Sequence, residues 1–408
     1  MIKLTNGGVF IKNGREVMDG TNLDAEQYRQ NTMAHEIMAA HNTAADMKKL
    51  KLKFDVLTSH DITYVGIIQT ARASGLERFP IPYILTNCHN SLCAVGGTIN
   101  EDDHIFGLTA AQKYGGIYVP PHLAVIHQYM RECWSACGRM ILGSDSHTRY
   151  GALGTMAIGE GGGELAKQLL NKTYDVNCPE VIAIKLSGKV RKGVGPQDVA
   201  LSIIGAVFKN NYVNNKVMEF IGDGIADLDV EYRNGIDVMT TETTCLSSIW
   251  ETDDKVQEYY QAHGRTQDYK KLAPGAIAYY DGMVEVDLSS IEPMIAMPSH
   301  PSNIYTIREV QANPEKIIAE VEANAQKEGN NISLKNKIID GKLHIQQGII
   351  AGCAGGTYDN IVDVVDIIGD KPLSNGEFSL SVYTSSQATY VELAKNGSID
   401  KLMTAGAI

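Results

Sequence analysis

The sequence predicts a multi-domain α/β protein of three-layer α/β/α architecture, with mainly parallel sheets covered by helices on both faces. Short apolar runs of β-rich composition alternate with amphipathic helical stretches, which is the pattern of parallel strands joined by helical crossovers. The length of 408 residues exceeds what one hydrophobic core supports, so several domains are expected. No internal repeat or low-complexity tract interrupts the alternation.

The individual elements follow from these patterns in chain order. Helices are expected at 61–76, 127–140 and 162–174, where apolar residues recur with helical spacing, and at 314–329, where one face is polar. A helix leading into a strand is expected at 401–408. The expected strands cover 54–60, 81–87, 115–121, 139–145, 180–188 and 343–352.

Two boundaries divide the chain into three predicted α/β segments, 1–178, 179–298 and 299–408. The first boundary lies at Cys178-Pro179, where the chain enters a new strand. The second lies in the Pro- and Ser-rich stretch 297–303, a composition typical of a linker.

Composition excludes several classes of function. The net charge is −12 and no basic run occurs, so nucleic acid is not expected as a partner. No apolar run is long enough to cross a membrane, and the first residues lack the layout of a signal peptide. We therefore expect a cytoplasmic protein.

The seven cysteines are scattered and show no zinc-like pair of CxxC motifs, so we expect reduced thiols. Cys133 and Cys137 fall four residues apart in the expected helix 127–140, which would place both on one face. This pair is open to two interpretations, a metal site or ordinary core packing, and packing is favoured because free cysteine behaves as a small hydrophobe.

The run 141–166 is the most informative part of the sequence. A strand ends at Gly143, and Asp145, Ser146 and His147 then crowd one loop at its carboxyl end. Ligands bind at this edge of open α/β sheets, and the three side chains together can orient and transfer a proton. A helix cap followed by tight glycine turns remains the alternative, whereas a nucleotide loop is disfavoured because GxGxxG and GK[ST] patterns are absent.

This run resembles the signature of the aconitase and isopropylmalate isomerase superfamily. The matching motifs are GSDSHT, GALG and IGEGGGE, and the resemblance continues through most of the chain in the same order. The further matching stretches are 127–133, 178–188, 195–207, 241–254, 292–298 and 349–361.

The resemblance implies a hydro-lyase that removes and re-adds water on a small di- or tricarboxylic acid such as citrate, isocitrate or an isopropylmalate-like acid. It implies two acid–imidazole pairs, Asp145 with His127 and Glu242 with His147, and Ser146 as a further functional position. It also implies a four-iron, four-sulfur cluster with one open iron, for which Cys353 matches the first cysteine ligand.

Several positions depart from the family pattern. His89 and Asn90 stand where the family has an Asp-His pair, so His89 is a candidate for the acid that protonates the leaving hydroxyl. His60 replaces a glutamine that helps to hold substrate, and we expect His60 and Asn90 to contact substrate. Ala354 follows Cys353 where the family has threonine, and the signature loop is one residue shorter.

The resemblance further implies a CxxC pair, substrate-binding arginines and a swivelling domain with a serine base. We expect all of these to lie beyond Ile408, so that this chain by itself lacks the cluster and is inactive. Two alternatives remain open. One is a non-catalytic binding or regulatory protein, and the other is a hydro-lyase with a single divalent metal ion held by His127, Asp145, His147 and Glu242.

Overall fold

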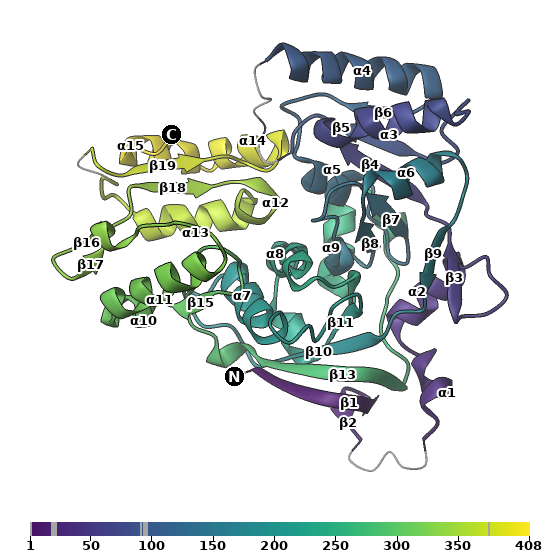
Figure 1. Ribbon diagram of the computed structural model, residues 1–408, viewed down its shortest axis with the longest axis horizontal. Helices are drawn as coiled ribbons and strands as arrows, with labels where there is room; N and C mark the ends of the chain where they lie inside the picture. The colour runs from purple at the N-terminus through teal and green to yellow at the C-terminus, as the bar shows by residue number, and fades with distance from the viewer. Residues whose placement is uncertain (1, 18–22, 90–91, 93–96, 374–375) are drawn as a thin grey trace.

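The computed structural model describes residues 2–17, 23–89, 92, 97–373 and 376–408. Two large sheets, each covered by helices, form most of the molecule, and a smaller layered unit carries the carboxyl terminus (Figure 1). The predicted α/β class with mainly parallel sheets is confirmed.

The first sheet has five strands, all parallel, in the order β6-β5-β4-β7-β8. Side chains alternate between its faces, so Leu57 and Leu142 pack with one set of helices while Val56 and Ile141 pack with another. The first face meets α3 (Asp61–Ala73), α4 (Thr98–Tyr114) and α6 (Gly162–Leu169), and the second meets α5 (Ile126–Cys133). The strands are β4 (Val56–His60), β5 (Tyr83–Thr86), β6 (Ile117–Val119), β7 (Met140–Gly143) and β8 (Met156–Gly159).

The second sheet has the order β12-β11-β10-β13-β1-β2. Its strands β10 to β13 run parallel, whereas the amino-terminal strand β1 pairs antiparallel with β13. One face packs under α7 (Pro196–Val207) and α8 (Val230–Met239), and the other shares a hydrophobic core with the first sheet. The strands are β1 (Ile2–Lys12), β2 (Arg15–Glu16), β10 (Val181–Ser187), β11 (Val217–Ile221), β12 (Ser247–Trp250) and β13 (Ile277–Asp287).

Shorter elements complete the first two-thirds of the chain. Helices α1 (Ala25–Arg29) and α2 (Met33–His41) follow the first hairpin, and α9 (Asp254–Ala262) follows β12. Strands β3 (Lys49–Leu52) and β9 (Tyr174–Asn177), far apart in the sequence, pair antiparallel.

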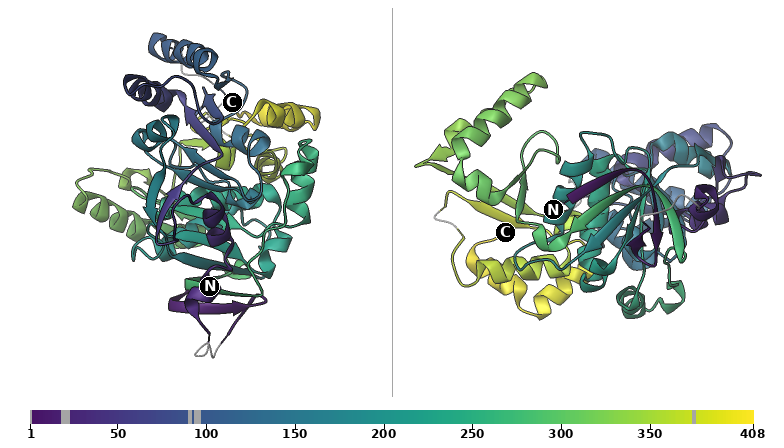
Figure 2. Two further views of the ribbon diagram at one scale, coloured as in Figure 1. Left: turned by 90° about the vertical axis from the view of Figure 1, so that its right-hand side faces the viewer. Right: turned by 90° about the horizontal axis from the view of Figure 1, so that it is seen from below.

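The last third forms a smaller layered unit. Strands β18 (Gln347–Ile350) and β19 (Ser379–Val382) are parallel, and helices flank them on both sides (Figures 1 and 2). The flanking helices are α12 (Gly352–Gly355), α13 (Tyr358–Ile368), α14 (Gln387–Lys395) and α15 (Ser398–Ala405). Before them come the short pairs β14 (Met294–Ala296) with β15 (Ile304–Thr306) and β16 (Ile338–Ile339) with β17 (Lys342–Leu343), and the helices α10 (Ile307–Ala312) and α11 (Pro314–Lys327).

The prediction of a helix over 127–140 is wrong for the second half of this range. Helix α5 ends at Cys133 because the chain must turn into strand β7 at Met140. Cys137 lies in the connecting loop, where its thiol donates to the carbonyl of Leu153 at 3.6 Å. The two cysteines therefore do not share a helical face.

The expected division into three segments stays a prediction. Residues 2–12, assigned to the first segment, form the strand that pairs with β13 of the second. At the other end, α15 is followed by backbone hydrogen bonds between Ile408 and strand β19, at Leu380 and Val382.

Candidate active site

The predicted site residues gather at the carboxyl ends of the first sheet. The chain passes from β4 through β5 to β6 on one side of β4, and it then returns to place β7 on the other side. Ligand sites in open α/β sheets lie outside the strand ends at such a reversal. His60 ends β4, His89 follows β5 and Asp145 follows β7, so adjacent strands deliver all three side chains to one place.

Asp145 is the centre of this group. Its side chain is 5% exposed, and its carboxylate accepts hydrogen bonds from His127 Nε2 at 3.0 Å and from the backbone N–H of His147 at 2.7 Å. His89 Nε2 lies 2.8 Å from the other carboxylate oxygen. Burial alone would raise the pKa of Asp145, but the hydrogen bonds from His127 and His89 outweigh it and hold the pKa well below its usual range. Asp145 is therefore an anion in the folded protein.

His147 and Glu242 form the second expected pair. Glu242 lies in the short helix after α8 (Thr240–Thr243), and its Oε1 is 3.0 Å from His147 Nε2. Both side chains reach solvent, with 37% and 24% of their surface exposed, so a ligand can reach them from outside. The hydrogen bond from His147 lowers the pKa of Glu242, against the effect of burial. Ser146 is exposed, and its hydroxyl lies 3.2 Å from His147 Nδ1.

His60 and His89 lie face to face beside Asp145. Their ring centroids are 4.2 Å apart, with an angle of 10° between the planes. Burial, together with the nearby His89, lowers the pKa of His60 to about 4, so its imidazole is neutral near pH 7. The hydrogen bond to Asp145 raises the pKa of His89. Asn90, expected to contact substrate, lies outside the described residues.

Cys353 lies on α12, close to this group. Arg131 on α5 donates to the Cys353 carbonyl at 2.9 Å, which links the carboxyl-terminal unit to the first sheet. Desolvation raises the pKa of the Cys353 thiol, Arg131 acts in the opposite direction, and the negative charge of Asp145 adds to the rise. The thiol and the Asp145 carboxylate are therefore near enough to interact electrostatically.

The described residues do not fit a four-iron cluster with one open iron, which needs three protein thiolates. Apart from Cys353, the thiols near the two sheets are engaged elsewhere in the folded chain. The Cys88 thiol donates to the Leu92 carbonyl and accepts from the His122 N–H, and the Cys245 thiol donates to the Thr240 carbonyl. Within the described ranges, Cys353 supplies at most one ligand.

The four-residue metal set of His127, Asp145, His147 and Glu242 is not gathered around one point. In the part of the chain that the structure describes, three donor atoms of His, Cys, Asp or Glu lie within 4.8 Å of one another only in His60, His89 and Asp145. His127 instead bonds Asp145 Oδ1, and not the Oδ2 that His60 and His89 approach. Glu242 bonds Nε2 of His147.

Three contributors to the site were missed. Tyr150 Oη lies 3.0 Å from His127 Nδ1, and Asp61 Oδ2 lies 3.0 Å from His104 Nε2, directly behind His60. His300 Nε2 lies 3.9 Å from Glu242, although its Pro- and Ser-rich surroundings predicted only a linker. Tyr150 follows the signature loop directly. This position is the one sequence signal that could have identified any of the missed residues.

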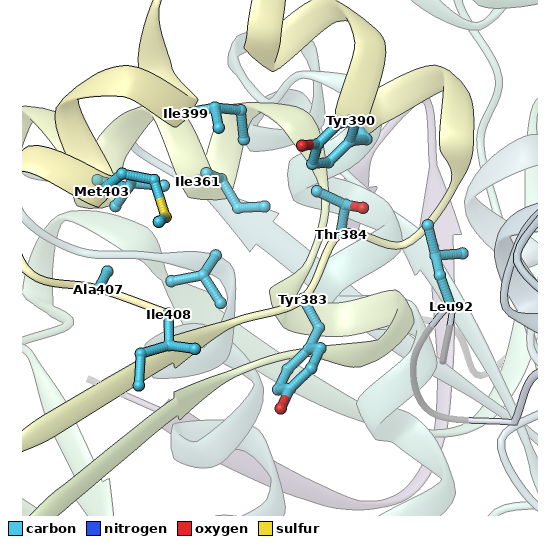
Figure 3. Close-up of a pocket in the computed structure, with 11 residues that line it drawn as sticks. Leu92, Ile361, Tyr383, Thr384, Tyr390, Ile399, Met403, Ala407 and Ile408 are labelled. Carbon is cyan, nitrogen blue, oxygen red and sulfur yellow. The ribbon is translucent and has the colours of Figure 1, made fainter. Parts of the chain in front are cut away.

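A separate apolar cavity of about 360 Å³ lies in the carboxyl-terminal unit (Figure 3). Ile361, Tyr390, Met403 and Ile408 are among the side chains that line it. Among the described residues that line it, no side chain is a carboxylate or an imidazole, so this cavity differs in character from the polar group around Asp145.

The fold and this group of side chains define an α/β protein with two acid–imidazole pairs at a sheet reversal. A family model described as the aconitase family (aconitate hydratase) matches residues 35–408. The chain belongs to the aconitase family, as its motifs predicted.

Individual relatives are more distant. The chain is 26% identical over 379 residues to the mitochondrial aconitate hydratase of Schizosaccharomyces pombe, which covers 88% of this chain and 45% of the relative. It is 29% identical over 284 residues to the 3-isopropylmalate dehydratase large subunit of Picrophilus torridus, covering 69% of this chain and 60% of the relative. The chain is 25% identical over 432 residues to the mitochondrial homocitrate dehydratase of Saccharomyces cerevisiae, and the match covers 95% of this chain and 51% of the relative.

The chain thus spans about half the length of the curated relatives it matches. No helix in the described ranges combines the length and the apolar character needed to cross a bilayer.

Proposed function

We propose that this chain carries the proton-handling part of the active site of a hydro-lyase that acts on a small di- or tricarboxylic acid. The observation that carries the proposal is the convergence of Asp145, His127, His147 and Glu242, which lie up to 115 positions apart in the sequence, on one group of side chains. The names of the relatives, two dehydratases and an aconitate hydratase, support the reaction class.

Dehydration breaks a carbon–hydrogen and a carbon–oxygen bond on adjacent carbons, and it releases water and leaves a double bond. In our proposal His147 exchanges a proton with the substrate at Nδ1, and Glu242, bonded to Nε2, fixes the orientation of the ring. The Asp145 group forms the floor of the site, where it binds the departing hydroxyl. His127 holds the Asp145 carboxylate in place through Oδ1.

The family implies an iron–sulfur cluster. The described cysteines do not provide the three thiolate ligands that it needs, so no catalytic step is assigned to it. The alternative remains a protein that binds a polycarboxylate without turning it over. The expectation that cluster ligands and a swivelling domain lie beyond Ile408 stays a prediction.

The test is turnover of citrate, isocitrate and isopropylmalate by the whole natural protein that carries this chain, followed by the ultraviolet absorbance of the unsaturated product. We expect His147→Gln and Glu242→Gln each to lower the rate by about 10²-fold or more, because each removes one member of a proton-transfer pair. His41→Gln is the matched control, since His41 forms a similar pair with Asp55 at 2.9 Å outside the site.

Equal rates in the two variants and the unaltered chain would contradict the assignment of the pair. Saturable binding of a polycarboxylate with no turnover would replace the hydro-lyase by the binding protein.

A further inference from the structure

Three potential metal ligands meet at the ends of three neighbouring strands. His60 Nε2 and His89 Nε2 lie 3.5 Å and 2.8 Å from the same oxygen of Asp145, and all three donor atoms lie within 4.8 Å of one another. The side chains of His60 and Asp145 are each 5% exposed, whereas His89 is 34% exposed. The group is therefore built into the sheet edge and is open on the His89 side.

We propose that His60, His89 and Asp145 bind a single divalent transition-metal ion such as Zn²⁺. Two imidazoles and one carboxylate on one side of an ion are a ligand set that Zn²⁺ and Fe²⁺ both accept, with positions left open for water or substrate. The set differs from a cysteine-held cluster, and it uses the two positions, 60 and 89, at which this sequence departs from the family pattern.

Hydrogen bonds behind the ligands fit this assignment. His127 donates to Asp145 Oδ1 and leaves Oδ2 toward the two histidines, and the Tyr150 hydroxyl can bond His127 Nδ1 to fix that tautomer. Carboxylates and imidazoles at metal sites are commonly held by such outer partners.

His60 supplies a second observation. Its Nδ1 is buried and has no hydrogen-bond partner among the described residues, although Asp61 Oδ1 lies 3.9 Å away. An ion on Nε2 requires the proton to be on Nδ1, which points to Asp61 as its acceptor. Asp61 is itself held by His104 Nε2 at 3.0 Å. The otherwise unpartnered nitrogen thus has a role when the ion is bound.

A small rearrangement accommodates the ion. Ligand atoms about 2.1 Å from an ion are separated from one another by roughly 3 to 3.5 Å, close to the distances already present. The stacked rings have parallel planes, so one ring must turn before both nitrogens point at the same ion. His89 can turn, because it is the more exposed of the two.

This site deepens the proposed function, although metal binding itself does not depend on it. An ion in the floor of the site would act as the Lewis acid that holds the departing hydroxyl. His89 would then have no proton to give on Nε2, which excludes the role of general acid expected for it.

The test is calorimetric titration of Zn²⁺ into the chelator-treated 408-residue chain without substrate, with Co²⁺ absorption as a second readout. We expect one Zn²⁺ per chain, and binding at least about 10-fold weaker in His60→Gln and in His89→Gln. Matched controls are His41→Gln, from a His–Asp pair elsewhere, and Cys353→Ser, from the neighbouring thiol; both should bind as the unaltered chain does. Thermal unfolding checks the fold of each variant. If His60→Gln does not fold, His89→Gln provides the test, because His89 is half-exposed.

Unchanged affinity in His89→Gln, or a loss of binding in Cys353→Ser alone, would overturn the site, as would no Zn²⁺ binding at micromolar concentration. Zn²⁺ binding through His60 and His89, together with no turnover of a polycarboxylate by the whole natural protein, keeps the metal site and refutes the hydro-lyase. Turnover by metal-free protein would refute only the role of the ion as Lewis acid.

Discussion

Replacing Glu219 by glutamine should remove a large part of the pH dependence of stability. Glu219 lies in the middle of β11 with none of its surface exposed. Its carboxylate accepts the backbone N–H groups of Met33 and Ala34 at 3.2 and 2.9 Å and the Tyr280 hydroxyl at 2.8 Å, which holds the start of α2 on the second sheet. Burial nevertheless raises the pKa of Glu219 to about 7, because these hydrogen bonds offset only part of the desolvation.

The sign follows from proton linkage. The pKa in the folded chain is about 7 and the ordinary value is 4.5, so the folded state binds protons more tightly than the unfolded state. The stabilisation that protonated Glu219 gives to the folded state is fully present below the pKa that Glu219 has in the unfolded chain. It is lost as the pH rises through the pKa that Glu219 has in the folded chain. As the pH rises from about 5.5 to about 8, titration of this one group lowers the free energy of unfolding of the unaltered protein by about 2 kcal/mol.

The assay is urea unfolding of both proteins at those two pH values. Glu219→Gln should be the less stable protein at both, since the amide presents N–H groups to backbone donors, but the difference should be about 2 kcal/mol smaller at the higher pH. Burial and then Glu219 raise the pKa of Glu251 to about 7, so losing Glu219 changes the difference in the same direction.

Glu36→Gln is the matched control, because Glu36 is an exposed carboxylate on α2, the helix whose start Glu219 holds. It should leave the pH slope unchanged. A difference between Glu219→Gln and the unaltered protein that stays constant over this pH range would refute the reasoning.

Three further predictions concern single side chains. Asp145→Asn should lower the free energy of unfolding by about 3 to 5 kcal/mol and abolish Zn²⁺ binding, because it removes the charge and leaves one acceptor oxygen where His127 and His89 use two; denaturant titration and calorimetry measure both effects. Tyr150→Phe should cost about 1 kcal/mol and change the tautomer populations of His127 in nitrogen-edited NMR spectra, and an unaltered His127 signal would exclude the positioning role. Arg233→Lys should cost about 2 to 4 kcal/mol, since lysine cannot make the paired bonds to Asp253 at 2.9 and 2.6 Å; an unchanged melting temperature would contradict this.

Local patterns were sufficient for most of the first sheet. The apolar runs at 54–60, 81–87 and 139–145 each contain an observed strand, because strands buried on both faces need continuous apolar sequence. The same patterns failed at 127–140, where helical spacing continued past Cys133 but the path to β7 required a loop. Local preference was outweighed there by the geometry of the sheet.

The acid–imidazole pairs were predicted from motifs, and the structure brings their members within hydrogen-bond distance. The roles of these residues in catalysis stay predictions. His300 and Asp61 were missed because each acquires its place in the site only by folding, His300 from a stretch with the composition of a linker and Asp61 from the first turn of α3.

The sequence by itself determined the α/β class, the family and the identity of the polar residues in the signature loop, since these depend on local pattern and ordered motifs. Only the tertiary structure decided that the donor atoms of His60, His89 and Asp145 lie close together. That grouping depends on the order of strands β5, β4 and β7 in the sheet, and long-range strand pairing leaves no mark in the local sequence.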